Sequence, residues 1–124
     1  EIAFGLPKKT DEEKAARTQA IQDATKYATE VPFHTMKVAF KAFEVVRAMA
    51  ETGNPNSVTD AGVGALCARS AVIGAHLNVK INAASLKDEA FKSKILKEAA
   101  EIEAAALVQE AEILQIVNKV IQGE

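Results

Sequence analysis

The stretch that decides the fold is Gly53–Asn82, "GNPNSVTDAGVGALCARSAVIGAHLNVKIN". Its middle is dense in alanine and glycine, which is typical of a helix that packs closely against its neighbours. Its two ends carry four asparagines and one aspartate, residues that form helix interiors poorly and are costly to bury. The stretch therefore predicts a closely packed helix and leaves the role of its polar ends to be explained.

The segments before this stretch are also predicted to be helical. Thr10 and Glu13 have the spacing of a capping box, which predicts a helix start at this point. Pro32 lacks a backbone N–H and clashes with the preceding turn, so a kink or short break is expected there. Apolar residues at helical spacing then resume over 33–51, and the signal Gly53–Pro55 ends the segment.

Two further helices are predicted beyond Pro55. One begins near Ser57, which has the pattern of an N-cap, and ends near Leu77, while residues 78–82 fit either a last turn or a loop. The last helix begins at a cap within 85–88 and continues to Gly123. Over thirty residues is long for a globular helix. The fold class is therefore predicted to be all-α, a multihelical bundle with a long C-terminal helix, paired in a dimer because its apolar faces exceed what so short a chain can cover.

The composition excludes several classes of protein. The 124 residues, 48% apolar and 26% charged, fit one globular domain. A net charge of −2 with no basic stripe argues against a nucleic-acid partner. The single cysteine, Cys67, excludes an intramolecular disulfide and fits a reducing, cytoplasmic location. The apolar stretch 61–79 is interrupted by Arg69 and His76, so we expect it to be buried in protein, with no membrane partner and no signal peptide.

Three local patterns are weak signals for chemistry. The glycines at 62 and 64 lack the third glycine of a dinucleotide fingerprint, because Cys67 occupies its position. His34, His76 and Cys67 lack the spacing of a zinc site, so no metal is expected, and His76 is interpreted as a packed or rim histidine. Small residues recur instead on one helical face, which predicts close helix approach. These are Ala61, Gly64, Ala65, Ala68, Ala71 and Ala75.

The polar ends of the central helix have two interpretations. The first end contains Asn54, Asn56, Ser57 and Asp60, and the second contains Asn78, Lys80 and Asn82. Helix capping, with Asp60 near the positive end of the helix dipole, explains the first end. A turn does not require asparagines on both sides of Val79 and Ile81. A ligand cleft is the alternative interpretation.

At these residues the sequence resembles the cyclodeaminase domain of the formiminotransferase-cyclodeaminase family, which stand-alone bacterial cyclodeaminases and methenyltetrahydrofolate cyclohydrolases share. The resemblance spans nearly the whole chain and rests on "LPKKT-DEEKAAR" at 6–17, on "TDAGVGA" and "GAHLNVKIN", and on "KDEAF" at 87–91. The family also carries an upstream Pro-Gly-Gly-Gly-Ser type segment that does not occur here. Residues 1–124 are therefore interpreted as the C-terminal two thirds of that domain.

The resemblance implies an all-helical dimer that binds folate near the subunit contact. The implied reaction is the conversion of 5-formimino-tetrahydrofolate to 5,10-methenyl-tetrahydrofolate with release of ammonia, without a metal or redox cofactor. Asp60 is the candidate catalytic residue, because a carboxylate can move a proton and stabilise the cationic carbon. A formiminotransferase domain or protein is an implied partner.

The same resemblance assigns the candidate substrate-binding residues. Asn78 and Asn82 are assigned to the pterin edge or the formimino group, together with Asn54 and Ser57 at the other polar end. Lys8 and Lys9 are assigned to the glutamate carboxylates of folate, although exposed lysines before a helix also serve solubility alone. Two alternatives stay open: a methenyltetrahydrofolate cyclohydrolase, and a non-catalytic helical module for oligomerisation or folate binding.

Overall fold

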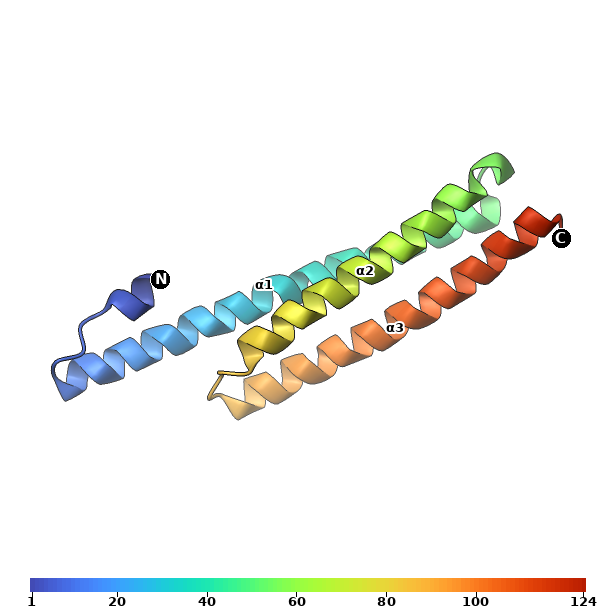
Figure 1. Cartoon of the computed structure of the whole chain (residues 1–124). Coiled ribbons are helices and arrows are strands. Elements are labelled where there is room, and N and C mark those ends of the chain that lie inside the picture. The colour runs from blue at the N-terminus through green and yellow to red at the C-terminus, as the bar shows by residue number, and fades with distance from the viewer.

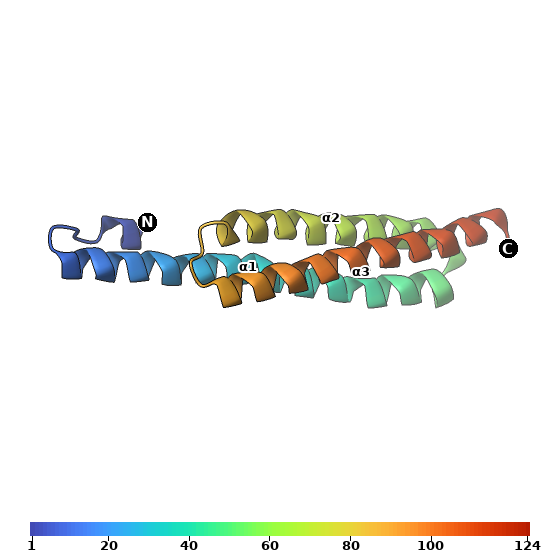
Figure 2. The same cartoon turned by 90° about the horizontal axis from the view of Figure 1, so that it is seen from below.

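The computed structural model describes all residues from 1 to 124 and consists of three long helices. The helices are α1 (Asp11–Thr52), α2 (Val58–Ala83) and α3 (Glu89–Gln122). Two short 3-10 helices, η1 (Ile2–Gly5) and η2 (Pro55–Ser57), precede α1 and α2. The long helices run side by side with alternating direction (Figures 1 and 2), which confirms the predicted all-α bundle with a long C-terminal helix.

The predicted capping box is present at the start of α1. The Thr10 hydroxyl accepts a hydrogen bond from the Glu13 N–H at 3.2 Å, and the Glu13 carboxylate accepts one from the Thr10 N–H at 3.2 Å. The same carboxylate also accepts from the Lys9 N–H at 2.7 Å. Acidic residues fill the first turn, where they are favourable toward the helix dipole. The chain therefore enters α1 in one defined direction.

The break expected at Pro32 does not occur, because α1 is one continuous helix of 42 residues. A proline inside a helix leaves the carbonyl four residues earlier without its N–H partner, and here that carbonyl belongs to Ala28. The Asn82 side-chain amide of α2 donates to the Ala28 oxygen at 3.2 Å. Thr29 and Phe33 on either side of Pro32 are buried. Tertiary contacts therefore replace the lost bond and keep the helix intact.

Two other predictions about helix ends need correction, and one is confirmed. Residues 78–82 belong to α2, which ends at Ala83 rather than near Leu77. Ser57 makes no capping hydrogen bond. The cap predicted within 85–88 is confirmed: it is Asp88, whose carboxylate accepts from the Phe91 N–H at 3.1 Å, and α3 ends at Gly123 as predicted, with φ of +79°.

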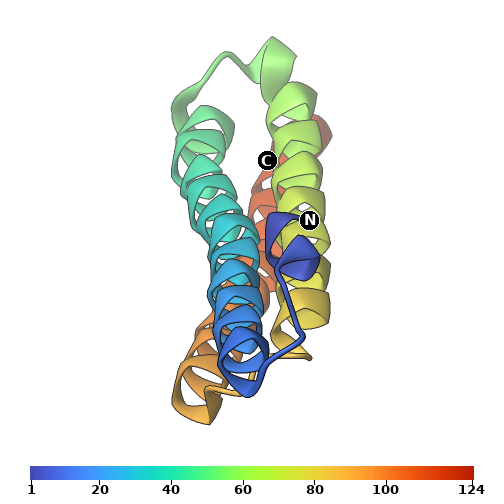
Figure 3. The same cartoon turned by 90° about the vertical axis from the view of Figure 1, so that its left-hand side faces the viewer.

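Small residues on α2 bring all three helices close together, as predicted. A Cβ atom added to Gly64 would lie 3.2 Å from Val46 of α1, and one added to Gly62 would lie 3.4 Å from Val117 of α3. Of the predicted small-residue face, only Ala71 is exposed. The core therefore lies between the three helices, which Figure 3 shows along the length of the bundle, and α1 and α3 contribute most of its larger side chains. Its fully buried members include Met36, Phe43, Ala65, Val72, Val79, Ala106 and Ile113.

Two ion pairs and a histidine–carboxylate hydrogen bond hold α3 against the other two helices. His76 is 6% exposed and its Nδ1 pairs with the Glu103 carboxylate, which confirms the interpretation of a packed histidine. Arg69 Nε lies 3.1 Å from the Glu110 carboxylate. On α1, Arg47 pairs with the carboxylate of Glu112 and donates to the side chain of Gln109. The charged residues of α2 that lie between its ends thus face α3.

The stretch Pro55–Ala83 is long and apolar enough, by length and composition alone, to cross a membrane. One third of its most apolar window is buried inside the bundle. Core helices of soluble proteins meet the same criterion, so this finding is weak evidence for a membrane span.

Candidate functional site

An open groove of about 750 Å³ lies between α1 and α2 and contains Asn78 and Asn82 from the second polar end of α2, but not Lys80. Its walls carry no charged side chain. The lining residues are Tyr27, Ala28, Val31, Pro32, Thr35, Ala71, Gly74, Ala75, Asn78 and Asn82. An apolar groove with a few polar groups is the usual form of a site for a flat organic ligand.

Backbone carbonyls orient both asparagines of this groove. The Asn82 amide nitrogen donates to the Ala28 oxygen and to the Asn78 backbone oxygen, at 3.2 and 2.9 Å. Both amide hydrogens of Asn82 are therefore used, and its carbonyl oxygen remains available as an acceptor. The exposed Asn78 side chain donates to the Gly74 oxygen at 3.2 Å. The groove thus presents two amide oxygens whose positions are set by the fold.

Asp60 lies at the opposite end of α2, in its first turn. Its side chain is exposed and makes no hydrogen bond or ion pair with another residue of the chain. Asn54 and Ser57 are exposed beside it, and the Asn54 side chain accepts from the Asn56 N–H at 3.0 Å. A carboxylate without a partner in the chain is free to contact a ligand.

The structure does not bring the two polar ends together within one chain. Asp60 and Asn78 are 18 residues apart on one helix, which corresponds to about five turns and about 27 Å. They therefore lie on the same side of α2 but near its opposite ends. The expectation that both ends line a single cleft is not met by an isolated chain.

Lys8 and Lys9 lie outside the groove as well. Both are exposed in the link between η1 and α1, at the end of α1 that projects beyond the other two helices (Figure 2). The groove begins near Ala28, about 26 Å along α1 from its start at Asp11. Neither lysine side chain contacts a carboxylate of this chain. Their assignment to folate carboxylates stays a prediction.

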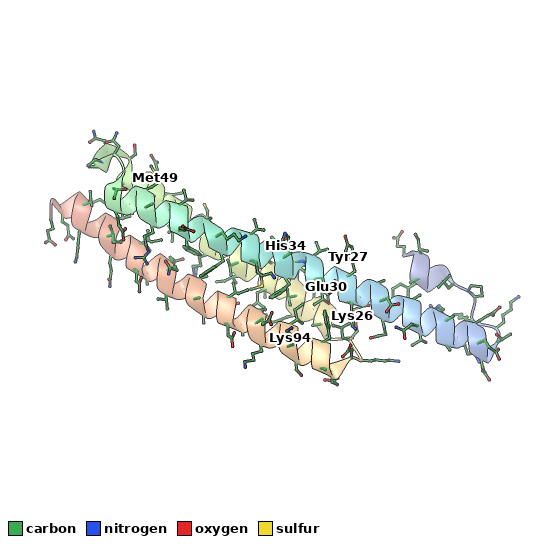
Figure 4. All side chains as sticks on the ribbon, turned by 180° about the vertical axis from the view of Figure 1, so that it is seen from behind. Lys26, Tyr27, Glu30, His34, Met49 and Lys94 are labelled. Atoms are coloured by element: carbon green, nitrogen blue, oxygen red, sulfur yellow. The ribbon has the colours of Figure 1, made fainter.

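A second groove, of about 350 Å³, lies between α1 and α3 and was not predicted from the sequence. Its lining is charged, in contrast to the first groove. Figure 4 labels Glu30 and His34 of α1 and Lys94 of α3 around it, and its floor contains Phe33 and Phe91. In the sequence, the charged residues of α1 are recognisable only as a solvent-exposed helix face. The residues of α3 that line the same groove come some 60 positions later, so the sequence does not show that the two sets lie together.

One ion pair closes the end of this second groove. Lys26 Nζ donates to the Asp88 carboxylate at 2.6 Å and lies 5.0 Å from the centre of the Phe91 ring. The hydrogen bond raises the pKa of Lys26 above its ordinary value of 10.5. The same bond, with that from the Phe91 N–H, lowers the pKa of Asp88 below 3.8. Both groups are solvated, so the pair contributes little to stability.

Comparison with known proteins identifies the family. Residues 2–101 match the model of the family described as formiminotransferase-cyclodeaminase. The chain belongs to the formiminotransferase-cyclodeaminase family. This result confirms the resemblance noted in the sequence, and it covers Asp60 and both groove asparagines.

Individual relatives carry two different names. The chain is 48% identical over 96 residues, 77% of its length, to a methenyltetrahydrofolate cyclohydrolase of Methylorubrum extorquens, and covers 46% of that protein. It is 34% identical over 92 residues, 74% of its length, to the formimidoyltransferase-cyclodeaminase of Rattus norvegicus, and covers 17% of it. It is also 34% identical to the formimidoyltransferase-cyclodeaminase of Dictyostelium discoideum. That match extends over 116 residues, which are 94% of this chain and 21% of the Dictyostelium protein. The chain thus spans less than half the length of these relatives.

Proposed function

We propose that this chain is part of a methenyltetrahydrofolate cyclohydrolase. The observation that carries the proposal is the 48% identity with the Methylorubrum extorquens protein of that name, against 34% with the rat formimidoyltransferase-cyclodeaminase. An uncharged groove that presents two amide oxygens suits the flat, polar-edged pterin ring of the substrate. The sequence alone favoured the deaminase, and the higher identity reverses that preference.

Asp60 is assigned the proton transfer in this reaction. Water adds to the cationic carbon between N5 and N10, the bond from that carbon to N5 breaks, and N5 takes a proton. The product carries the formyl group on N10, and one proton is released. A carboxylate without an internal partner can accept the proton of the attacking water and stabilise the positive charge, contributions that together are worth about 10²- to 10⁴-fold.

The cyclodeaminase reaction is the second candidate, favoured by the names of the rat and Dictyostelium relatives. In this reaction N10 attacks the formimino carbon, the bond to the formimino nitrogen breaks, and that nitrogen leaves as ammonia. Starting from the protonated formimino group, Asp60 would carry the proton from N10 to the leaving nitrogen, which gives neutral ammonia and the methenyl cation. Because both reactions pass through a cationic carbon between the same two nitrogens, one site serves either.

The remaining assignments follow the same proposal. Asn78 and Asn82 would accept hydrogen bonds from the pterin edge, and Lys8 and Lys9 would contact the glutamate carboxylates. We propose no metal or redox cofactor, a cytoplasmic location and a homodimer. For the deaminase alternative, a formiminotransferase domain or protein would supply the substrate.

A near-ultraviolet time course of methenyl-tetrahydrofolate tests the proposal. With methenyl-tetrahydrofolate as substrate, a cyclohydrolase accelerates the loss of its absorbance. With 5-formimino-tetrahydrofolate, a cyclodeaminase produces this absorbance and ammonia in equal amounts. The chain and a version extended to the length of the Methylorubrum extorquens relative are assayed together. If neither protein turned over either substrate, the proposed function would be contradicted.

A further inference from the structure

A hollow of about 500 Å³ continues the uncharged groove toward the start of α1. It shares Ala28 and Asn82 with that groove, so the two cavities adjoin along α1. Glu1, which is exposed, is the only charged residue of its lining. We call this cavity the η1 hollow, because residues of η1 form one of its walls. Its large apolar lining residues are Ile2, Phe4, Ile21 and Ile81.

Arg17 holds η1 in place beside the first turns of α1. Its Nε and Nη2 atoms donate to the Phe4 carbonyl oxygen at 3.3 and 3.1 Å, and its guanidinium lies 5.8 Å from the centre of the Phe4 ring. Hydrogen bonds from a charged donor are stronger than neutral ones, and the cation–π contact adds to them. Figures 2 and 3 show η1 beside the first part of α1, in line with α2. η1 therefore faces the C-terminal end of α2 across the η1 hollow.

Arg17 has no carboxylate partner in the chain, unlike the other two arginines. Arg47 and Arg69 each pair with a glutamate of α3. Arg17 is half-buried, and its bonds to Phe4 use two of the five N–H groups of a guanidinium. The other N–H groups are free to donate, and the bonds to Phe4 fix their direction. A planar guanidinium with free donors is suited to bind a carboxylate through two parallel hydrogen bonds.

The position of Arg17 suits an elongated ligand that begins in the groove. A folate consists of a pterin, a benzoyl ring and a glutamate, in that order. Arg17 and Ala28 are 11 positions apart on α1, which corresponds to about 17 Å. The η1 hollow lies between these two levels, and the carboxylate of Glu1 favours an uncharged ring there over an anion. Lys26, the only other cation of α1 between Arg17 and Ala28, is paired with Asp88. Arg17 is therefore the first unpaired cation that such a ligand reaches along α1.

We propose that the η1 hollow is the second half of the folate site, in which Ile2 and Phe4 cover the benzoyl ring and Arg17 binds a carboxylate of the glutamate. The pterin lies in the uncharged groove beside its two asparagines. Lys8 and Lys9, which lie farther from the groove, remain the candidates for the second carboxylate. Arg17 and η1 thus bind and orient the ligand and take no part in proton transfer. The identity of the ligand rests on the proposed function.

Calorimetry with two matched ligands tests the role of Arg17. The ligands are 5-formyl-tetrahydrofolate and the same compound with both glutamate carboxylates converted to amides. Arg17→Gln should weaken binding of the first ligand at least about 10-fold more than binding of the diamide, because only the first loses a hydrogen bond between charged groups. Arg17→Lys keeps the charge but loses the planar fork, so its affinity should lie between those of the wild type and Arg17→Gln. Lys97→Gln on α3, an exposed lysine without a partner, is the control for the change in charge and should bind both ligands as the wild type does.

Phe4→Ala tests the wall of the hollow separately. The benzoyl ring is the same in both ligands, so the loss of the Phe4 ring should weaken both equally, by about 3- to 10-fold. The Phe4 carbonyl remains in this variant and can still accept from Arg17. Circular dichroism checks that all variants remain helical.

Three results would overturn the proposal. They are a wild-type chain that does not bind 5-formyl-tetrahydrofolate, equal weakening of both ligands by Arg17→Gln, and wild-type affinity for both ligands in Phe4→Ala. The expected binding pattern without turnover of methenyl-tetrahydrofolate or 5-formimino-tetrahydrofolate would leave the η1 hollow in place and count against the proposed reaction alone.

Discussion

The two ends of α2 carry similar polar side chains but use them differently. At the C-terminal end, both amide hydrogens of Asn82 bind backbone oxygens, one of them the carbonyl that Pro32 leaves without a partner. At the N-terminal end, the Asp60 carboxylate has no partner in the chain. A side chain whose hydrogen bonds are satisfied positions other groups, whereas an unpaired one can react. The comparison therefore assigns structure and recognition to the Asn82 end and proton transfer to the Asp60 end.

Replacing the unpaired carboxylate gives the largest expected effect. Asp60→Asn keeps the size and polarity of the side chain but removes its charge, so turnover of methenyl-tetrahydrofolate should fall about 10²- to 10⁴-fold. Because the side chain contacts no other residue, the midpoint of urea unfolding should remain unchanged. Full turnover in this variant would exclude Asp60 as the catalytic residue.

Replacing the paired amide should mainly lower stability. Asn82→Ala leaves the Ala28 carbonyl without a donor, and we expect the free energy of unfolding to fall by about 1 to 2 kcal/mol. Asn78→Ala is the control: its amide bonds only within α2 and is exposed, so the change should be within about 0.5 kcal/mol. Urea unfolding followed by circular dichroism measures both.

The role of Pro32 sharpens this second prediction. In a Pro32→Ala background, the backbone of residue 32 can donate to the Ala28 oxygen itself. In this background, Asn82→Ala should lower the free energy of unfolding by less than half as much as it does in the wild type. A double-mutant cycle measures this difference. An equal loss in both backgrounds would show that Asn82 does not compensate for the proline.

The ion pair beyond the Asn82 end should give a small pH dependence. Because the folded-state pKa of Asp88 is lowered, its stabilising contribution is present above about 3.8 and is lost as the pH falls through the folded-state value. Because the folded-state pKa of Lys26 is raised, the contribution of Lys26 to stability is complete below pH 10.5 and is lost only as the pH rises through the folded-state value. Unfolding midpoints measured between pH 2.5 and 5 for the wild type and for Asp88→Asn should converge at the acidic end. Parallel curves would contradict the pairing.

The weakest effect is expected at the residue first predicted to cap α2. Ser57 makes no capping hydrogen bond, so Ser57→Ala should change the free energy of unfolding by less than about 0.5 kcal/mol. Thr10→Ala is the matched comparison, with an expected loss of about 1 kcal/mol because Thr10 does cap α1. Similar losses in the two variants would contradict the assignment of caps.

Local signals in the sequence predicted much of this fold, and long-range contacts account for the differences. The capping box at Thr10 and the close approach at Gly64 depend on residues only a few positions apart or on a repeated small-residue pattern. The continuity of α1 through Pro32 depends on Asn82, which is 50 residues later in the chain. No local pattern contains that pairing, so the break predicted at Pro32 was wrong.

The same distinction applies to the candidate site. The family resemblance and its motifs indicated Asp60, Asn78 and Asn82 from the sequence, and the family match covers all three. The separation of about five helical turns between Asp60 and Asn78 became visible only when residues 58–83 proved to be one uninterrupted helix.

An activity assay on mixed chains tests most directly whether the two ends of α2, which one chain keeps apart, act together in the proposed homodimer. A chain with Asp60→Asn and a chain with Asn78→Ala are each expected to have little activity toward methenyl-tetrahydrofolate. Mixed in equal amounts and allowed to exchange subunits, they should regain about one quarter of the wild-type activity, because half of the sites in the mixed dimers are intact. Activity that stays at the level of the separate variants, while the wild-type chain is active, would contradict a site shared between copies.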